Sequence, residues 1–199
     1  MTTLLLVSGS QRRDSFNGRL LRDIAARVAG RCSIDTLEPH EVDLPLFNQD
    51  LETDSSVVAR VLQSYRRFEA SHGIIVASPE YNGQPTPYLK NLIDWVSRLP
   101  HVDGQFANPF LGRPLLLCSA STGWSGGGAG MAHARALFAH VGCVVMGDSI
   151  NVPHAAEAWT GTAFAFDPFF DAEIDGAIHQ IVRLADAASG AKRQRVAAA

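Results

Sequence analysis

The chain has 199 residues, of which 46% are hydrophobic and 19% are charged, and its formal net charge is −3. This length suits one domain whose core needs neither a disulfide nor a metal ion, and the composition is that of an ordinary globular protein. The small negative charge argues against a dominant nucleic-acid function, because binding to a phosphate backbone requires a basic face.

Short apolar runs alternate with amphipathic segments along the chain. Four runs without polar alternation predict buried strands, and a weaker alternating run adds a fifth, at 4–7, 32–37, 73–77, 115–118 and 143–146. Apolar residues at helical spacing predict helices within 16–28, 57–65, 89–96, 137–141 and 174–185. Together they predict an α/β fold, a doubly wound five-stranded parallel sheet with helices on both faces. The flavodoxin-like order 2-1-3-4-5 fits this pattern, although periodicity alone leaves a Rossmann order open.

The chain shows no internal repeat and no linker between domains. We therefore expect residues 1–187 to form a single domain. Residues 38–54 are polar and contain proline, which predicts a long surface loop. Residues 188–199 lack a second apolar face, so we expect a C-terminal tail that frays.

The segment 8–17 joins the first predicted strand to the first predicted helix, at the end of a parallel sheet where ligands bind. Gly9 permits a tight turn, and Arg12 offers a planar fork for a phosphate. The helix begins near Ser15, so its free N–H groups face the same loop. The loop therefore predicts a cradle for a phosphate monoester. Alternatively, Ser15 is only an N-cap and Gly9 only a turn residue.

Two further loops follow predicted strands. In the segment 77–85, two prolines and a glycine stiffen the chain, so its peptide groups can face the polar edge of a flat ring, which Tyr81 could cover. Tyr81 could instead be packed in the core. In the segment 119–128, four glycines allow a ligand or another backbone to approach closely. Because this segment follows a strand and precedes a helix, we interpret it as a binding loop.

The pattern Gly9-Ser10-x-Arg12-x-x-Ser15-x-Asn17 resembles the phosphate loop of NADPH-dependent FMN reductases. The stretch Ser78-Pro79-Glu80-Tyr81-Asn82-Gly83, with Leu89-Lys90-Asn91 and Asp94-Trp95, is similar to the flavin-ring loop and next helix of that family. The similarity extends from Leu4 to about Leu184. One departure is the absence of an arginine soon after the glycines of the third loop, where the nearest is Arg135.

The resemblance implies non-covalently bound FMN and a set of cofactor-binding residues. Those at the phosphate would be Ser10, Arg12, Ser15, Phe16 and Asn17. Those at the ring and the ribityl chain would be Pro79, Glu80, Tyr81, Asn82 and Gly83, and those closing the other side would be Ser119, Ser121, Thr122 and Gly123. The flavin would carry the chemistry, so no side chain is predicted to act as acid, base or nucleophile.

The activity that the resemblance implies is electron transfer from NADPH or NADH to a small acceptor by a ping-pong mechanism. The acceptor could be a quinone, an azo compound, a metal oxyanion or free flavin. An FMN-holding electron carrier or redox sensor without NAD(P)H turnover is the alternative, and a phosphate-binding domain without flavin is a third reading. The family generally forms homodimers or homotetramers. Trp95, Leu99 and Phe106 would then form either core or a dimer contact.

The remaining sequence features point away from other site classes. The three cysteines form no C-x-x-C pair, which argues against a zinc site or a dithiol motif and favours a reduced, cytoplasmic protein. The histidines form no H-E-x-x-H motif, so no metal site is predicted. The N-terminal apolar run is too short for a signal peptide or a membrane span, so no membrane association is expected.

Overall fold

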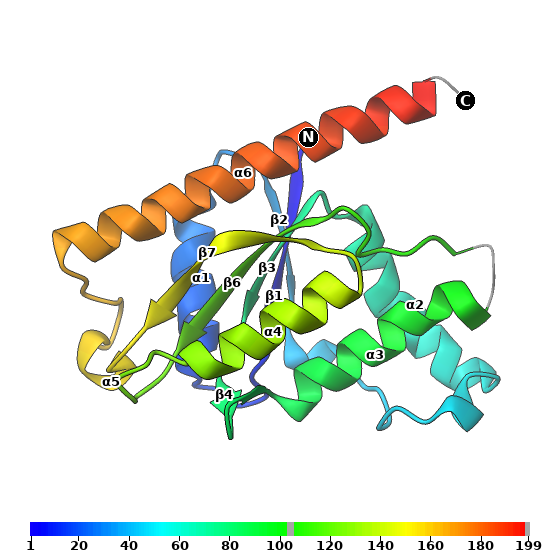
Figure 1. Ribbon diagram of the computed structural model, residues 1–199, viewed down its shortest axis with the longest axis horizontal. Coiled ribbons are helices and arrows are strands. Elements are labelled where there is room, and N and C mark those ends of the chain that lie inside the picture. The colour runs from blue at the N-terminus through cyan, green and yellow to red at the C-terminus, as the bar shows by residue number, and fades with distance from the viewer. Residues whose placement is uncertain (103–105, 198–199) are drawn as a thin grey trace.

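The computed structural model describes residues 1–102 and 106–197 of the chain (Figure 1). Five parallel strands form one sheet in the order β2-β1-β3-β6-β7. They are β1 (Thr3–Ser8), β2 (Ser33–Leu37), β3 (Gly73–Ala77), β6 (Pro114–Ala120) and β7 (Val144–Val152). This order confirms the predicted flavodoxin-like sheet and excludes the Rossmann alternative.

Helices cover both faces of the sheet, as Figure 1 shows. Two helices pack on one face, α1 (Phe16–Val28) and α6 (Pro168–Ala197). Three pack on the other face, α2 (Ser55–Ala70), α3 (Pro87–Val102) and α4 (Gly128–His140). The middle strands are covered on both sides, which explains why their sequences are apolar without alternation.

Helices α1 and α2 begin where short polar side chains cap them. Ser15 Oγ accepts a hydrogen bond from the Gly18 N–H at 2.9 Å, which starts α1. Asp54 Oδ1 accepts from the N–H groups of Ser56 and Val57 at 2.8 and 3.2 Å, which starts α2. Such caps satisfy N–H groups that have no partner inside the helix. Ser15 is thus an N-cap, and its hydroxyl donates no hydrogen bond to the residues that the structure describes.

Several elements differ from their predicted bounds. Strand β7 continues to Val152, whereas the predicted strand ended at residue 146. The prediction stopped early because Gly147, Asp148 and Ser149 interrupt the apolar pattern, although the strand continues through them. The loop 38–54 contains the short 3₁₀ helices η1 (Pro39–Glu41) and η2 (Gln49–Leu51). Helix α6 continues to Ala197, so the fraying of 188–199 stays a prediction, and residues 198–199 lie outside the described residues.

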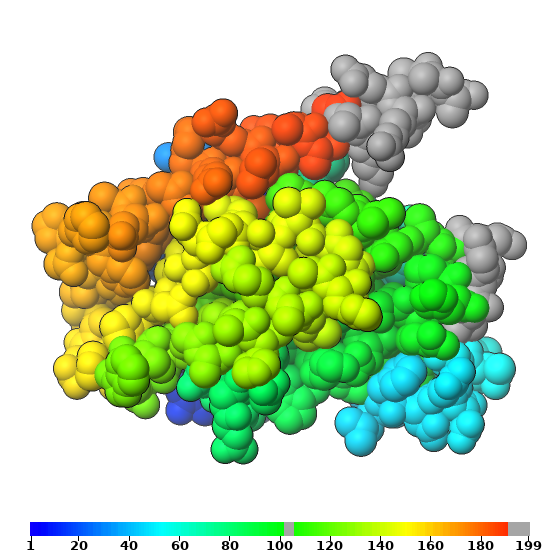
Figure 2. Space-filling model, viewed as in Figure 1, coloured from blue at the N-terminus to red at the C-terminus, as the bar shows by residue number. Residues whose placement is uncertain are grey.

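Three short elements were not predicted at all. Strands β4 (Glu80–Tyr81) and β5 (Gln84–Pro85) form an antiparallel hairpin directly after β3, and α5 (Ala155–Ala158) follows β7. Figure 2 shows the hairpin standing out from the lower edge of the molecule, beside α4. Each element is too short to produce a periodic pattern.

Trp95 and Leu99 belong to the core and not to a dimer surface. They are 2% and 3% exposed, and the Trp95 Nε1–H donates a hydrogen bond to the Pro45 carbonyl at 2.7 Å. Phe106 packs edge-on against the buried Tyr65, with the ring centroids 5.2 Å apart. Of the two alternatives for these apolar residues, core or dimer contact, the structure therefore supports the core.

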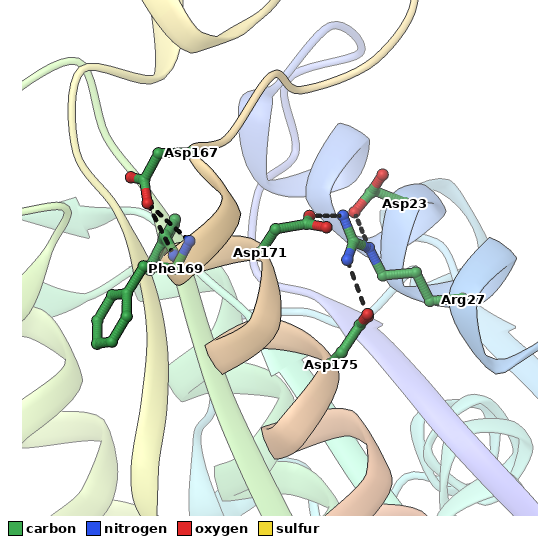
Figure 3. Close-up of polar contacts among 7 residues, drawn as sticks. Asp23, Arg27, Asp167, Phe169, Asp171 and Asp175 are labelled. Atoms are coloured by element: carbon green, nitrogen blue, oxygen red, sulfur yellow. Dashed lines mark hydrogen bonds and ion pairs between the residues drawn. The ribbon is translucent and has the colours of Figure 1, made fainter.

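An ion-pair cluster joins the first and last helices (Figure 3). The Arg27 guanidinium on α1 lies 2.8 Å from Asp23, 2.6 Å from Asp171 and 2.9 Å from Asp175, and the last two belong to α6. Close by, Asp167 Oδ1 accepts hydrogen bonds from the N–H groups of Phe169 and Phe170 at 3.0 Å and so caps α6.

In the described part of the chain, no helix is long and apolar enough to span a membrane.

Candidate functional site

A cavity of about 340 Å³ opens at the edge of the sheet where the strands end. We call it the edge cavity. It is lined by Ser10, Arg12, Ser15, Phe16, Asn17, Pro79, Glu80, Tyr81, Ala120, Ser121 and Thr122. These residues follow β1, β3 and β6, which are adjacent in the sheet. The size is typical of small-molecule sites, which span roughly 300–1,000 Å³.

Most of the predicted site residues meet in this cavity. Apart from Ala120, every residue that lines it is among those proposed from the sequence. The other four predicted residues lie within two positions of lining residues in the chain and are not among the lining residues themselves: Asn82, Gly83, Ser119 and Gly123. Their roles stay predictions.

The first loop presents unsatisfied hydrogen-bond donors to the edge cavity. The N–H groups of Phe16 and Asn17, at the start of α1, donate to no other described residue. The Ser10 side chain is buried, and its hydroxyl has no hydrogen bond within the described residues. Arg12 is exposed and donates to the Asp14 carbonyl at 3.1 Å, without a carboxylate partner among the described residues. Donors of this kind favour an anion.

Gly9 allows this loop to pass close to the second loop. A Cβ at Gly9 would lie 2.6 Å from both Cβ and Oγ of Ser78. The Gly9 N–H donates to the Ala77 carbonyl at 2.8 Å, and the Gly9 carbonyl accepts from Thr86 Oγ1 at 2.6 Å. Gly9 is therefore required for close approach, since its backbone is held from both sides.

Asn17 joins the first and third loops. Its side-chain Nδ2 donates to the Ala120 carbonyl at 2.9 Å, and its Oδ1 accepts from the Ala120 N–H at 3.0 Å. The residue is only 2% exposed. This two-way bond sets the distance between α1 and the end of β6, and thus the width of the edge cavity.

The β4–β5 hairpin forms the opposite wall. Its turn residues Asn82 and Gly83 both have positive φ, 54° and 73°, as a type I′ turn requires. Tyr81 is 52% exposed beside the turn, so it is not packed in the core. This hairpin was not predicted, although an Asn-Gly pair is a strong hairpin signal.

Helix α4 holds this hairpin in place. Glu80 Oε2 accepts from the Gly130 N–H at 2.8 Å, and His133 Nδ1 lies 2.8 Å from the Gly83 carbonyl and 3.1 Å from the Ala129 carbonyl. Both partners of His133 Nδ1 are carbonyls, so this nitrogen must carry the proton. A Cβ at Gly130 would lie 2.5 Å from Glu80 Cβ. We call these contacts the hairpin latch.

The third loop is bound to the chain after β7. The Ser121 N–H donates to the Val152 carbonyl at 3.0 Å, and the Ala155 N–H donates to the Ser121 carbonyl at 2.9 Å. Gly126 and Gly127 have positive φ, 60° and 87°. A Cβ at Gly127 would collide with Ser119 Oγ, which is buried and has no hydrogen-bond partner among the described residues. The glycines thus serve the tight fold of the loop itself.

Arg135 does not replace the arginine that the third loop lacks. Its guanidinium donates to the carbonyls of Met146 and Gly147 on β7, away from the edge cavity.

Cys118 is fully buried in β6, and burial raises the pKa of its thiol far above the usual range. No thiolate nucleophile therefore comes from this strand. The cavity offers donors for an anion at one end and a stiff hairpin at the other.

Comparison with known proteins places the chain in a family. The family profile described as NADPH-dependent FMN reductase matches residues 2–157. The chain is 31% identical over 138 residues to a quinone reductase of Escherichia coli, which covers 69% of this chain and 70% of that protein. It is 34% identical over 170 residues to the NADPH:quinone oxidoreductase of Arabidopsis thaliana, with 84% and 78% covered.

Solved structures show the same architecture. FerB, a flavoenzyme NAD(P)H:(acceptor) oxidoreductase from Paracoccus denitrificans, superimposes with a TM-score of 0.79 at 28% identity. That match covers 94% of this chain and 98% of FerB. The similarity thus extends over nearly the whole length of both chains.

Proposed function

The chain belongs to the NADPH-dependent FMN reductase family, and we propose on that basis that it holds FMN in the edge cavity and transfers electrons from a nicotinamide donor to a small quinone-type acceptor. The observation that carries this proposal is the set of unsatisfied donors at the first loop. They lie at one end of a cavity whose other end is a stiff hairpin.

The first loop fits the phosphate of FMN. The Ser10 hydroxyl, the Arg12 guanidinium and the free N–H groups of Phe16 and Asn17 form a donor set suited to a phosphate dianion. Ser15 contributes its hydroxyl hydrogen while its oxygen caps α1. Asn17 acts mainly as a positioning residue, because its amide is held by Ala120.

The hairpin fits the ring. Pro79, Glu80 and Tyr81 line the cavity opposite the first loop, and the hairpin latch keeps this wall in place. When bound, FMN supplies the redox chemistry, since it takes up hydride from a nicotinamide and passes electrons to an acceptor. The side chains bind, orient and exclude water. If the nicotinamide and the acceptor occupied the edge cavity in turn, ping-pong kinetics would follow.

The acceptor class and the assembly follow from the relatives. The E. coli and A. thaliana relatives are quinone reductases, which supports a flat quinone-type acceptor here. We also propose a homodimer or homotetramer, as the family resemblance implies, which light scattering of the FMN-loaded protein would test.

The three unpaired, buried cysteines support a reducing compartment such as the cytoplasm.

The experiment that tests this function removes two phosphate ligands. In the double variant Ser10→Ala/Arg12→Ala, we expect the Kd for FMN to rise about 100-fold, because two phosphate hydrogen bonds are lost, one of them charge-assisted. Flavin fluorescence titration measures this. Riboflavin, which has no phosphate, is the control ligand, and its affinity should not change.

Anaerobic mixing with NADPH tests turnover. Bleaching of the flavin absorption band, followed by reoxidation with a quinone, is the expected result. A protein that binds FMN without bleaching would be an electron carrier. A colourless protein that ignores added FMN would contradict the proposal, as would a double variant with unaltered FMN affinity.

A further inference from the structure

Arg19 on α1 lies between two aromatic rings and not beside a carboxylate. Its guanidinium carbon is 5.3 Å from the centre of the Phe16 ring and 4.6 Å from that of the Trp159 ring. Among the described residues, this half-buried guanidinium forms no ion pair and no hydrogen bond. A guanidinium over an aromatic face is attracted by the negative face of the ring. The two rings therefore determine where this side chain lies.

Trp159 is itself fixed by neighbouring rings. It pairs with Phe164 in an antiparallel bridge, and the two ring centroids lie 5.1 Å apart. Phe164 is buried and stacks on Phe166, with the centroids 5.5 Å apart. Just before these rings, the Ala155 N–H donates to the Ser121 carbonyl of the third loop. Trp159 thus offers Arg19 a fixed surface that is also connected to the third loop.

The other ring on Arg19 belongs to the edge cavity. Phe16 is the first residue of α1 and lines the cavity. Arg12 lines the cavity too, and its guanidinium carbon lies 5.9 Å from the centre of the Phe16 ring. Trp159, Arg19, Phe16 and Arg12 therefore form a continuous series of contacts, which we call the cation–π row. Neither Arg19 nor Trp159 is among the residues that line the cavity.

Arg19 also places a cation near the wrong end of a helix. Its N–H donates to the carbonyl of the cap residue Ser15 at 3.1 Å, and the first turn of α1 contains no acidic residue. The N-terminal end of a helix carries a positive partial charge, so a cation near it is unfavourable to the helix alone. An anion bound at the same end reverses this effect. The position of Arg19 thus suits a helix that receives an anion.

We propose that Arg19 and Trp159 are positioning residues for FMN. Through the Phe16 ring they hold Arg12 beside the edge cavity, and so they raise the affinity for the phosphate without touching it. This inference rests on the proposed function, because Arg12 is the proposed phosphate ligand. An exposed arginine loses freedom of motion when it binds a ligand, and a side chain that is already held close to its bound position loses less.

The first test replaces Trp159, because this side chain carries no charge and does not line the cavity. In Trp159→Leu, we expect the Kd for FMN to rise about five-fold, as the loss of one cation–π contact predicts. The Kd for riboflavin, which has no phosphate, should change by less than about two-fold. Trp159→Phe keeps an aromatic face for Arg19 and should bind FMN nearly as the wild type does. Flavin fluorescence titration measures all of these constants.

The second test replaces Arg19. In Arg19→Leu, we expect the Kd for FMN to rise about ten-fold, because both ring contacts are lost, again with little change for riboflavin. Arg19→Lys should restore most of the affinity, since an ammonium group is also attracted to an aromatic face. Arg19 is half-buried on the surface of a helix, so its variants decide the question even if Trp159→Leu does not fold.

Phe170→Leu is the matched control. Phe170 belongs to the same group of rings and packs edge-on against Phe166, with the centroids 5.2 Å apart, but it is not part of the cation–π row. This variant should lower the stability measured by urea denaturation and leave both flavin affinities unaltered.

Three results would overturn the inference. Equal losses of FMN and riboflavin affinity would show that the row only stabilises the fold. Unaltered FMN affinity in both Trp159→Leu and Arg19→Leu would show that the row has no effect on the cavity. A loss in Arg19→Leu alone would show that Arg19 acts through its charge and not through the rings. By contrast, a wild-type protein that binds no FMN would contradict the proposed function itself.

Discussion

Asn17 links two loops of the edge cavity through a single side chain. Its amide both donates to and accepts from the Ala120 backbone, so the end of β6 is hydrogen-bonded beyond its pairing with β3, which ends at Cys118. Asn17 also belongs to the sequence pattern that resembles a phosphate loop. The structure thus shows support of the loop, whereas phosphate contact by Asn17 stays a prediction from the pattern.

Replacing Asn17 distinguishes these roles. We expect Asn17→Ala to lower the free energy of unfolding of the FMN-free protein by about 2 kcal/mol, because the buried N–H and carbonyl of Ala120 lose their partner. Urea denaturation measures this loss. If the FMN-free stability were unaltered and only FMN affinity fell, Asn17 would be a direct phosphate ligand.

At the scale of elements, the hairpin latch depends on a glycine inside a helix. Gly130 lies in α4, where alanine would normally stabilise a helix by up to about 1 kcal/mol. A Cβ there would meet Glu80 Cβ at 2.5 Å and the Gln84 carbonyl at 3.4 Å. The close approach of the hairpin therefore outweighs helix propensity at this position.

We expect Gly130→Ala to destabilise the protein by about 1–3 kcal/mol, the usual range for overpacking, and to weaken FMN binding as the hairpin moves outward. Gly128→Ala is the matched control, because it lies in the same helix and its Cβ would meet nothing within 4 Å. Urea denaturation and FMN titration compare the two. Equal effects of both variants would show that the latch does not set the hairpin position.

The predictability of the elements follows their burial. Strands such as β1 and β3 could be predicted because both faces are buried and their sequences are continuously apolar. The end of β7 could not, because this edge strand contains Gly147 and Asp148, which are exposed. The two-residue strands of the hairpin produce no period, and only Asn82-Gly83 marks them.

The candidate site was predictable for a similar reason. Loops at the ends of adjacent parallel strands must converge, so residues from three distant segments could be placed together. The hairpin latch was not predictable, because Gly130 and His133 act through contacts 50 residues away along the chain from Glu80 and Gly83. Sequence spacing contains no information on such contacts.

On the scale of the whole molecule, the Arg27 cluster fastens the last helix to the first. The guanidinium contacts two carboxylates of α6 that are 144 and 148 residues further along the chain. Removing Arg27 would leave Asp23, Asp171 and Asp175 close together without a cation. Repulsion between them would then add to the loss of three contacts.

We expect Arg27→Ala to cost about 1 kcal/mol of unfolding free energy at low salt, and less at 1 M salt, because the cluster is partly exposed and screened. The control is Arg60→Ala, which removes one exposed pair with Asp43 and should cost close to nothing. Urea denaturation at both salt concentrations measures the difference. A loss independent of salt would assign the effect to packing of the arginine stem.

The three walls of the edge cavity also affect the order of events in folding. They follow β1, β3 and β6, and the register between β3 and β6 joins segments about 40 residues apart. A chain in which β6 has not yet paired lacks the third wall, so under the proposed function we expect it not to retain FMN. Capture of flavin during refolding should therefore lag behind helix formation and coincide with closure of the central sheet. The time course of flavin fluorescence quenching during refolding would then report the rate of long-range strand pairing.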